Sequence, residues 1–159
     1  MSTPAAKLGL KCKLYLNGGT FGSPTWAAVN CISDFSLAAK WDAGEASTRE
    51  SRMKLWLKTM LDLGFSGKLR SSNINDTSYT TIAAALLTDA TLDILVLNGD
   101  KVDTGAWGFR CGVQVHSANE DQGLGAVVFD EIEFKPAPNT DGNYSSALVT
   151  AGAAVFTAF

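Results

Sequence analysis

A hydrolase of the usual kind would have to use the one histidine of this chain. The sequence contains a single histidine, His116, and serine or cysteine nucleophiles normally pass their proton through such a side chain. No Gly-x-Ser-x-Gly turn accompanies it. His116 follows Gln114 in an alternating segment, so its simplest place is the polar face of a strand. We therefore expect no catalytic residues, although an enzyme would require His116.

A group of carboxylates between residues 120 and 133 could bind calcium or supply an acid and base pair for glycoside hydrolysis. Its members are Glu120, Asp121, Asp130, Glu131 and Glu133. They lack the Asp-x-Asp-x-Asp-Gly order of a calcium loop. Their spacing favours a solvated or pore-facing acidic patch, and we expect no metal.

The cysteines, glycines and tryptophans do not indicate a cofactor either. Cys12, Cys31 and Cys111 are widely spaced and odd in number, which predicts buried thiols rather than disulfides or a zinc site. The glycine pairs fit no phosphate-binding sequence. Four tryptophans could form a stacking platform for sugars or bases, but core and interface packing is the simpler interpretation. They are Trp26, Trp41, Trp56 and Trp107.

Length and composition predict one globular domain. The chain has 159 residues, of which 46% are hydrophobic and only 18% are charged, below the roughly 25% usual for soluble domains. Such a surface suggests contact with something other than water. A net charge of -3 disfavours nucleic-acid wrapping. The sequence has no apolar stretch of the roughly 18 to 20 residues that span a bilayer, and its first residues lack a secretory signal, so we expect a cytoplasmic protein without membrane contact.

The first half of the sequence shows the period of two that is typical of strands. Apolar side chains alternate from Leu8 to Leu16, a turn follows at Asn17-Gly18-Gly19, and a second strand runs from about Thr25 to Lys40. The segment Trp41 to Arg52 is polar and predicts a long loop. After it, apolar residues occupy the odd positions from Leu55 to Leu69, and Gly64 and Gly67 exclude the competing helix.

The second half begins with a helical stripe, for which we predict a helix from about Ser78 to Asp89 with a small, uncharged outer face. A strand over residues 92 to 96 then ends at Asn98-Gly99, a hairpin signal. The returning strand covers residues 109 to 116, and a turn follows at residues 120 to 123. The last clear strand is Leu124 to Lys135, with a bulge near Asp130 where its apolar positions change parity.

These elements make residues 1–138 a single β-sandwich domain, with the long loop at 41–52. Residues 139–159 form a C-terminal arm, which is linker-like at first and apolar without a clear period from Ala147. The arm could lie across a neighbour or pack on its own domain.

The order of elements, together with four segments, resembles the tail tube proteins of long-tailed bacteriophages. The segments are Leu10 to Leu16, Trp26-Ala27-Ala28-Val29, Thr48-Arg49-Glu50-Ser51-Arg52 and Val127 to Pro136, within a likeness that covers Lys7 to about Pro138. The resemblance implies a mainly β, antiparallel sandwich or barrel-like fold with one flanking helix. It also implies rings of six copies that stack into the conduit for DNA ejection.

The resemblance implies roles for two groups of residues. The long loop would contact the neighbouring ring, through Trp41, Asp42, Glu45, Arg49, Glu50 and Arg52. Three acidic residues on polar strand faces are the candidates for a lumen wall that repels phosphate, namely Asp62, Glu131 and Glu133.

The expected partners are other copies of the chain, together with tape-measure, tail-terminator and baseplate proteins. DNA would be present only in transit, no cofactor is expected, and the protein would be made in the host cytoplasm and reside in the virion tail. Two alternatives remain open. One is a monomeric β-sandwich module that binds carbohydrate or peptide; the other is a tail-completion or baseplate subunit of the same fold.

Overall fold

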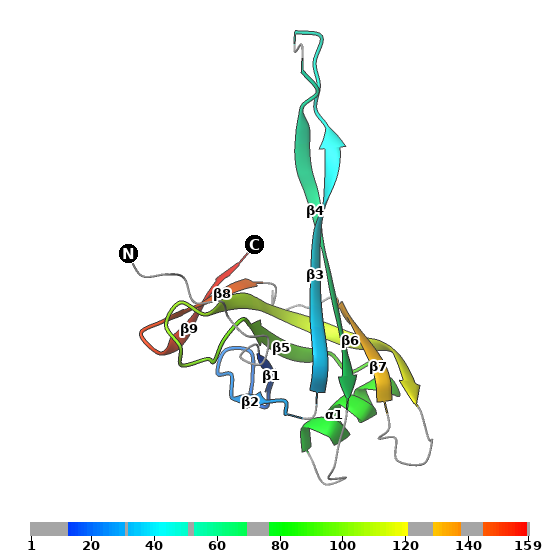
Figure 1. Cartoon of the computed structure of the whole chain (residues 1–159), viewed down its shortest axis with the longest axis vertical. Coiled ribbons are helices and arrows are strands. Elements are labelled where there is room, and N and C mark those ends of the chain that lie inside the picture. The colour runs from blue at the N-terminus through cyan, green and yellow to red at the C-terminus, as the bar shows by residue number, and fades with distance from the viewer. Residues whose placement is uncertain are drawn as a thin grey trace.

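The computed structural model describes residues 13–30, 32–50, 53–69, 77–120, 129–137 and 145–158. Nine strands and one helix follow one another along these residues (Figure 1). They are β1 (Lys13–Asn17), β2 (Trp26–Ala28), β3 (Ile32–Glu45), β4 (Trp56–Leu69), α1 (Thr77–Leu86), β5 (Leu92–Leu97), β6 (Trp107–Glu120), β7 (Phe129–Pro136), β8 (Ser145–Thr150) and β9 (Ala153–Ala158).

All strand pairs among these elements are antiparallel, in one sheet of order β2-β1-β5-β6-β7-β4-β3. The sheet branches at β6, because residues 107–110 of this long strand pair with β8 while residues 113–120 pair with β7. One branch therefore ends at β3 and the other at β9. The expected fold class, mainly antiparallel β with one flanking helix, is confirmed.

Both faces of the central strands are buried, which explains the continuous apolar run in β5. Ile94 and Val96 belong to a large core cluster, whereas Leu95 and Leu97 belong to a second cluster on the opposite face. Helix α1 covers the first cluster with Ile82 and Ala85. The hairpin β8–β9 covers the second with side chains that include Ala147, Val149 and Phe156. A strand buried on both faces loses the alternation of polar and apolar residues.

Helix α1 ends at Leu86, three residues before the predicted end. Its threonines are compatible with a helix because the Thr80 and Thr81 hydroxyls donate to the Thr77 carbonyl oxygen, at 3.0 and 2.7 Å. The outward positions Thr80 and Ala84 are exposed, as the predicted small, uncharged outer face requires.

The predicted bulge near Asp130 is confirmed by the strand register. Asn119 lies opposite Glu131 and Glu120 opposite Phe129, so Asp130 is the extra residue on β7. After the bulge the buried side chains occupy even positions, as Ile132 and Phe134 show. The predicted strand residues 124–128 lie outside the described part of the chain, as do residues 8–12 of the first strand.

Four predictions of secondary structure differ from the structure. Trp41 to Glu45 belong to β3 rather than to a loop, and the predicted strand from Thr25 to Lys40 is divided into β2 and β3. The predicted tight turn at Asn98-Gly99 is instead a connection of residues 98–106 between β5 and β6. Within it, the Asp103 N–H donates to the Asp100 carbonyl and the Asp100 N–H donates to the Asp103 carboxylate. The C-terminal arm contains the hairpin β8–β9, whose first strand pairs with β6.

The turn between β8 and β9 explains how a segment without a clear period forms a hairpin. Its two residues, Ala151 and Gly152, have φ values of 52° and 78°. Positive φ at both central positions is the geometry of a two-residue turn whose twist matches that of paired strands. Alanine adopts this region at a cost, so the pair Ala151-Gly152 has only half of the usual sequence signal for such a turn.

Candidate functional site: the projecting hairpin and the polar sheet face

Strands β3 and β4 form a hairpin that extends far beyond the body of the domain (Figure 1). The pairing runs from Ile32 opposite Leu69, in the body, to Glu45 opposite Trp56, near the tip. Hydrogen bonds continue past the last pair, where the Ala46 N–H donates to the Leu55 carbonyl at 2.9 Å. Five residues of β4, from Trp56 to Met60, lie on the tip side of Leu61. At roughly 3.3 Å per residue, they extend about 17 Å out of the core.

The projecting part of the hairpin carries large apolar side chains that are in contact with solvent. Trp41 is 44% exposed and Trp56 is 59% exposed. Other exposed apolar side chains of the hairpin are Met53, Leu55, Leu57 and Met60. Apolar surface concentrated on one exposed element marks an interaction site.

A register shift places the two tryptophans on one face. Trp41 lies opposite Leu61, but Ala43 lies opposite Lys58, so β4 holds one extra residue between them. Along a strand, every second side chain lies on the same face of the sheet. Residues directly opposite each other on paired strands also share a face. Trp41 therefore shares its face with Lys58 and Trp56, and the Lys58 ammonium nitrogen lies 5.5 Å from the Trp41 ring centroid.

The predicted contact residues occupy two parts of the hairpin. Trp41, Asp42 and Glu45 are exposed residues of β3, and Arg49 and Glu50 are exposed residues of the connection. Arg52 lies outside the described residues. Trp56 and Met60 were not among the predicted contact residues, because both fall within the predicted strand from Leu55 to Leu69. The sequence signal was that apolar residues occupy both odd and even positions between Trp56 and Leu61, at the tip end of β4. One buried face cannot explain this pattern.

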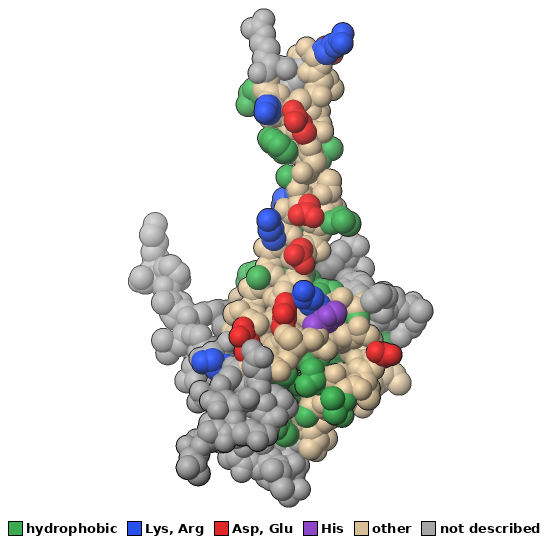
Figure 2. All heavy atoms as spheres, turned by 90° about the vertical axis from the view of Figure 1, so that its right-hand side faces the viewer, with side chains coloured by type: hydrophobic (Ala, Val, Ile, Leu, Met, Phe, Trp, Pro, Cys, Tyr) green, Lys and Arg blue, Asp and Glu red, His purple; other side chains and the backbone are tan. Residues whose placement is uncertain are grey.

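The predicted lumen residues Asp62, Glu131 and Glu133 share the sheet face opposite α1. Glu133 lies opposite Ser66 of β4, which is on the same side of that strand as Asp62. Glu131 follows the same alternation on β7. Figure 2 shows acidic and basic side chains along the hairpin and below it.

This polar face has mixed charge. The Lys135 ammonium lies 3.5 Å from a Glu133 carboxylate oxygen, and the Ser117 hydroxyl donates to the other oxygen at 3.4 Å. Asp62 lies directly opposite Lys40 in the β3–β4 register. Each of these two acids therefore has a lysine close by, which lowers the net negative charge of the face.

His116 is exposed at a bulge of β6. Val115 lies opposite Phe134 and Ser117 opposite Glu133, so His116 is the extra residue between them. The histidine appears at the base of the hairpin in Figure 2. Within the described residues, no group of three or more His, Cys, Asp or Glu side chains could hold a metal ion.

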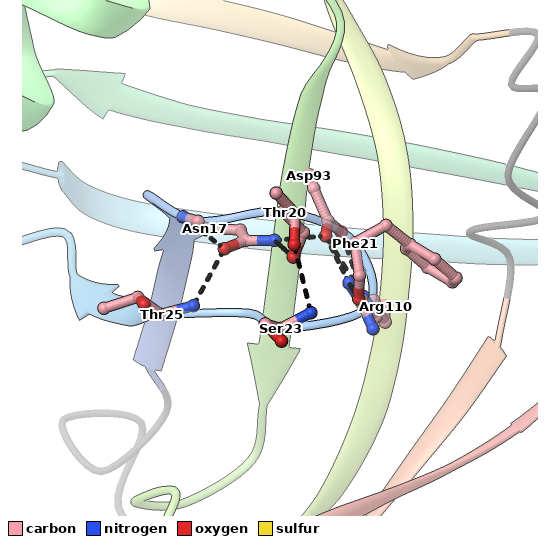
Figure 3. A network of polar contacts seen from close by, with 8 residues as sticks. Asn17, Thr20, Phe21, Ser23, Thr25, Asp93 and Arg110 are labelled. Carbon is pink, nitrogen blue, oxygen red and sulfur yellow. Dashed lines mark hydrogen bonds and ion pairs between the residues drawn. The ribbon is translucent and has the colours of Figure 1, made fainter.

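Arg110, which was not among the predicted site residues, is the centre of a network of polar contacts (Figure 3). Its side chain is 4% exposed, and the guanidinium donates to both carboxylate oxygens of Asp93, with an Nη2–Oδ2 distance of 2.6 Å. Nη2 also donates to the Phe21 carbonyl oxygen at 3.0 Å. Three aromatic rings surround the guanidinium carbon at 4.1 to 5.1 Å, namely Phe21, Trp26 and Phe156.

Asn17 connects this network to the loop between β1 and β2. Its amide nitrogen donates to Asp93 at 2.9 Å, and its side-chain oxygen accepts from the backbone N–H of Gly19 and of Thr25. The network thus joins β1, β5, β6, the loop and, through Phe156, the C-terminal hairpin. Its centre, the buried ion pair between Arg110 and Asp93, has the geometry of a structural clamp rather than of a ligand site.

A second charged group lies at the surface, beside the connection between β5 and β6. The Lys13 ammonium donates to Asp100 at 2.7 Å, which raises the pKa of Lys13 and lowers that of Asp100. The Tyr15 hydroxyl donates to the same carboxylate at 3.3 Å, and burial raises the pKa of Tyr15. These bonds hold the connection against β1.

We predict that Cys111 resists alkylation in the folded protein. Burial, with a smaller effect from Asp93, raises the pKa of its thiol from 9.0 to about 12. At about pH 8 this lowers the thiolate fraction roughly a thousandfold. Iodoacetamide labelling followed by peptide mass mapping should show Cys111 modified in urea but not in buffer, and equal rates would contradict the prediction. Between pH 9.0 and about 12 the unfolded thiol ionises while the folded one keeps its proton, so this group lowers stability as pH rises.

The fold is similar to those of several solved tail structures. The tail of an empty gene transfer agent particle, with C6 symmetry, aligns with a TM-score of 0.63 at 15% identity, over 96% of this chain and 100% of that chain. The SPP1 tail tube aligns with a TM-score of 0.65 at 9% identity, over 84% of this chain and 77% of that chain. The baseplate of the anti-feeding prophage aligns with a TM-score of 0.53 at 15% identity, over 87% and 95% of the two chains.

These identities are low, so the likeness establishes a shared fold. The resemblance to tail tube proteins expected from the sequence is confirmed at that level. Neither the protein-family models nor the curated protein sequences include a match to this chain. No helix in the described residues is long and apolar enough to cross a membrane.

Proposed function

We propose that this chain is the repeating subunit of a phage-type tail tube, with a structural rather than a catalytic role. The observation that carries the proposal is the whole-chain likeness to a tail of C6 symmetry. Copies would close into rings, most simply of six, and the rings would stack into a conduit for DNA in a virion tail. Tape-measure, tail-terminator and baseplate proteins would be the partners of such a tube.

The projecting hairpin would join successive rings. An element that extends about 17 Å beyond its own core with exposed tryptophans has surface to bury only against another molecule. Asp42, Glu45, Arg49 and Glu50 surround that apolar surface with both charges, which favours one register over others. Arg52 belongs to the same proposed contact by its position in the sequence.

The polar face that contains Asp62, Glu131 and Glu133 would line the conduit. Carboxylates repel phosphate, while the neighbouring Lys40 and Lys135 limit that repulsion. A wall of this kind would neither grip the DNA nor oppose its passage strongly.

Replacing Asp62 and Glu133 together with lysine is expected to slow DNA passage while leaving ring formation intact. The change reverses the charge on an exposed face without removing buried side chains. DNA ejection rate and infectivity of particles with the double variant measure the effect. The charge-conserving pair Asp62→Glu and Glu133→Asp is the control, and unchanged ejection in the lysine variant would contradict the assignment of this face to the lumen.

Self-assembly of the purified protein tests the proposed function. Light scattering against concentration, followed by negative-stain electron microscopy, should show hollow tubes with a regular axial repeat. A monomer at every concentration whose tryptophan fluorescence changes with a sugar or peptide would instead support the binding-module alternative.

A second candidate is a baseplate or tail-completion subunit, and the likeness to the anti-feeding prophage baseplate favours it specifically. Such a subunit would form a single ring and stop. Particles of one ring thickness at high concentration, in place of tubes of indefinite length, would support this candidate over the tube subunit.

A further inference from the structure

The sheet ends in three edge strands, and only two of them are protected against pairing. β2 has three residues, which is too short to act as a template. β3 carries Lys40, Asp42 and Glu45 toward its tip and has two register shifts, so only its short stretch of residues 36–39 is both uncharged and regularly paired. Charge, short length and bulges are the usual means by which proteins block an exposed edge.

The third edge, β9, has none of these features. Its six residues have the sequence AAVFTA and pair with β8 alone among the described strands. Residues 145 to 159 contain no charged side chain and no proline, in a chain that is 18% charged. An uncharged edge of this kind readily accepts another strand.

A row of apolar side chains leads to the same edge. Trp107 of β6 lies opposite Leu148 of β8, which lies opposite Val155 of β9. Their exposed fractions are 54%, 50% and 53%. Three neighbouring strands thus present a continuous apolar row on one face, which ends at the open side of β9.

The hairpin β8–β9 is held firmly in place. The Val149 N–H donates to the Ala106 carbonyl at 2.7 Å, and the Val149 carbonyl accepts from Gly105 at 2.9 Å. On the inner face, Phe156 packs against Trp26 and the Arg110 guanidinium. The open edge is therefore a fixed template rather than a loose arm.

We infer that the hairpin β8–β9 is the lateral contact between copies of this chain. The open edge of β9 pairs with an edge strand of a second copy, and the row Trp107, Leu148 and Val155 packs against that copy. The inference rests on the proposed ring assembly. The occupant is a second copy because a closed ring needs two different surfaces on each subunit, and the branched sheet ends in β9 on one branch and in β3 on the other. The part of β3 that can accept β9 of the next copy is residues 36–39, which are uncharged and pair with β4 without a register shift.

Val155→Lys tests this inference, because it places a charge on the edge at an exposed position that folding does not need buried. Leu87→Lys is the matched control, since Leu87 is 86% exposed and lies beyond the end of α1. We expect Val155→Lys to raise the concentration needed for assembly at least tenfold and Leu87→Lys to leave it unchanged. Circular dichroism and thermal unfolding establish that both variants fold.

Hydrogen exchange of the wild-type protein gives a readout that does not depend on a variant. Backbone amides of β9 should gain protection when dilute monomer is compared with assembled protein. Tubes in which β9 amides stay unprotected, or normal assembly of Val155→Lys, would overturn this inference and leave the proposed function standing. A wild-type chain that remains monomeric, or whose β9 is protected only by a different protein, would overturn the inference and count against the proposed function.

Discussion

Tubes should fail to form when Trp41 and Trp56 are both replaced by serine, although single rings should persist. Both side chains lie on one face of the projecting hairpin, and both are largely exposed in the monomer. Tryptophans buried at the centre of an interface commonly contribute about 2 kcal/mol or more each. Loss of two corresponds to roughly a thousandfold weaker contact for each subunit.

Negative-stain microscopy and sedimentation velocity measure this effect directly. The thermal unfolding midpoint should hardly change, because replacing exposed side chains away from the core has little effect on stability. Leu87→Ser, which removes an even more exposed apolar side chain elsewhere, should leave the tubes unchanged. Tubes of wild-type length from the double tryptophan variant would rule out the hairpin as the contact between rings.

Arg110→Met is expected to lower the free energy of unfolding by about 3 kcal/mol or more. The substitution leaves the partly buried Asp93 carboxylate without its cation and the Phe21 carbonyl without a donor. Urea unfolding measures the loss. Arg110→Lys should be intermediate, because an ammonium cannot match the planar fork that contacts both oxygens of Asp93.

Two further variants distinguish the contribution of the buried Arg110–Asp93 pair to stability from that of the surface Lys13–Asp100 pair. Lys13→Met removes a pair whose side chains are both substantially exposed, so its effect should be small. Adding Asp93→Asn to Arg110→Met should restore part of the lost stability, since it removes the uncompensated charge. An Arg110→Met protein as stable as the Lys13→Met protein would contradict the role of Arg110 as a clamp.

Local patterns predicted much of the body of the fold, because one buried face imposes a period. The alternation in β4 from Leu61 to Leu69, the stripe of α1 and the even apolar positions after Asp130 all follow from that single cause. Trp41 to Glu45, on the β3 side of the projecting hairpin, were predicted as part of a loop because a strand with solvent on both faces has no period to detect. Strand β9 was not predicted for a similar reason, since small and apolar residues occupy both its odd and its even positions.

The candidate site was predicted only in part. Trp41, Asp42 and Glu45 were identified as contact residues, while Trp56 and Met60 required the register that places them on a projecting hairpin. Arg110 has no local signal, because it looks like any polar residue on one face of a strand. Its partners come from β5, the loop after β1, β2 and β9, so only the tertiary structure brings them together.

Cryo-electron microscopy of the assembled wild-type protein tests the central claim most directly. A helical reconstruction should show stacked rings in which the β3–β4 hairpin of each subunit crosses into the adjacent ring, with Trp41 and Trp56 buried there. Rings whose hairpins point freely into solvent, or an assembly without a central channel, would contradict the proposed tube.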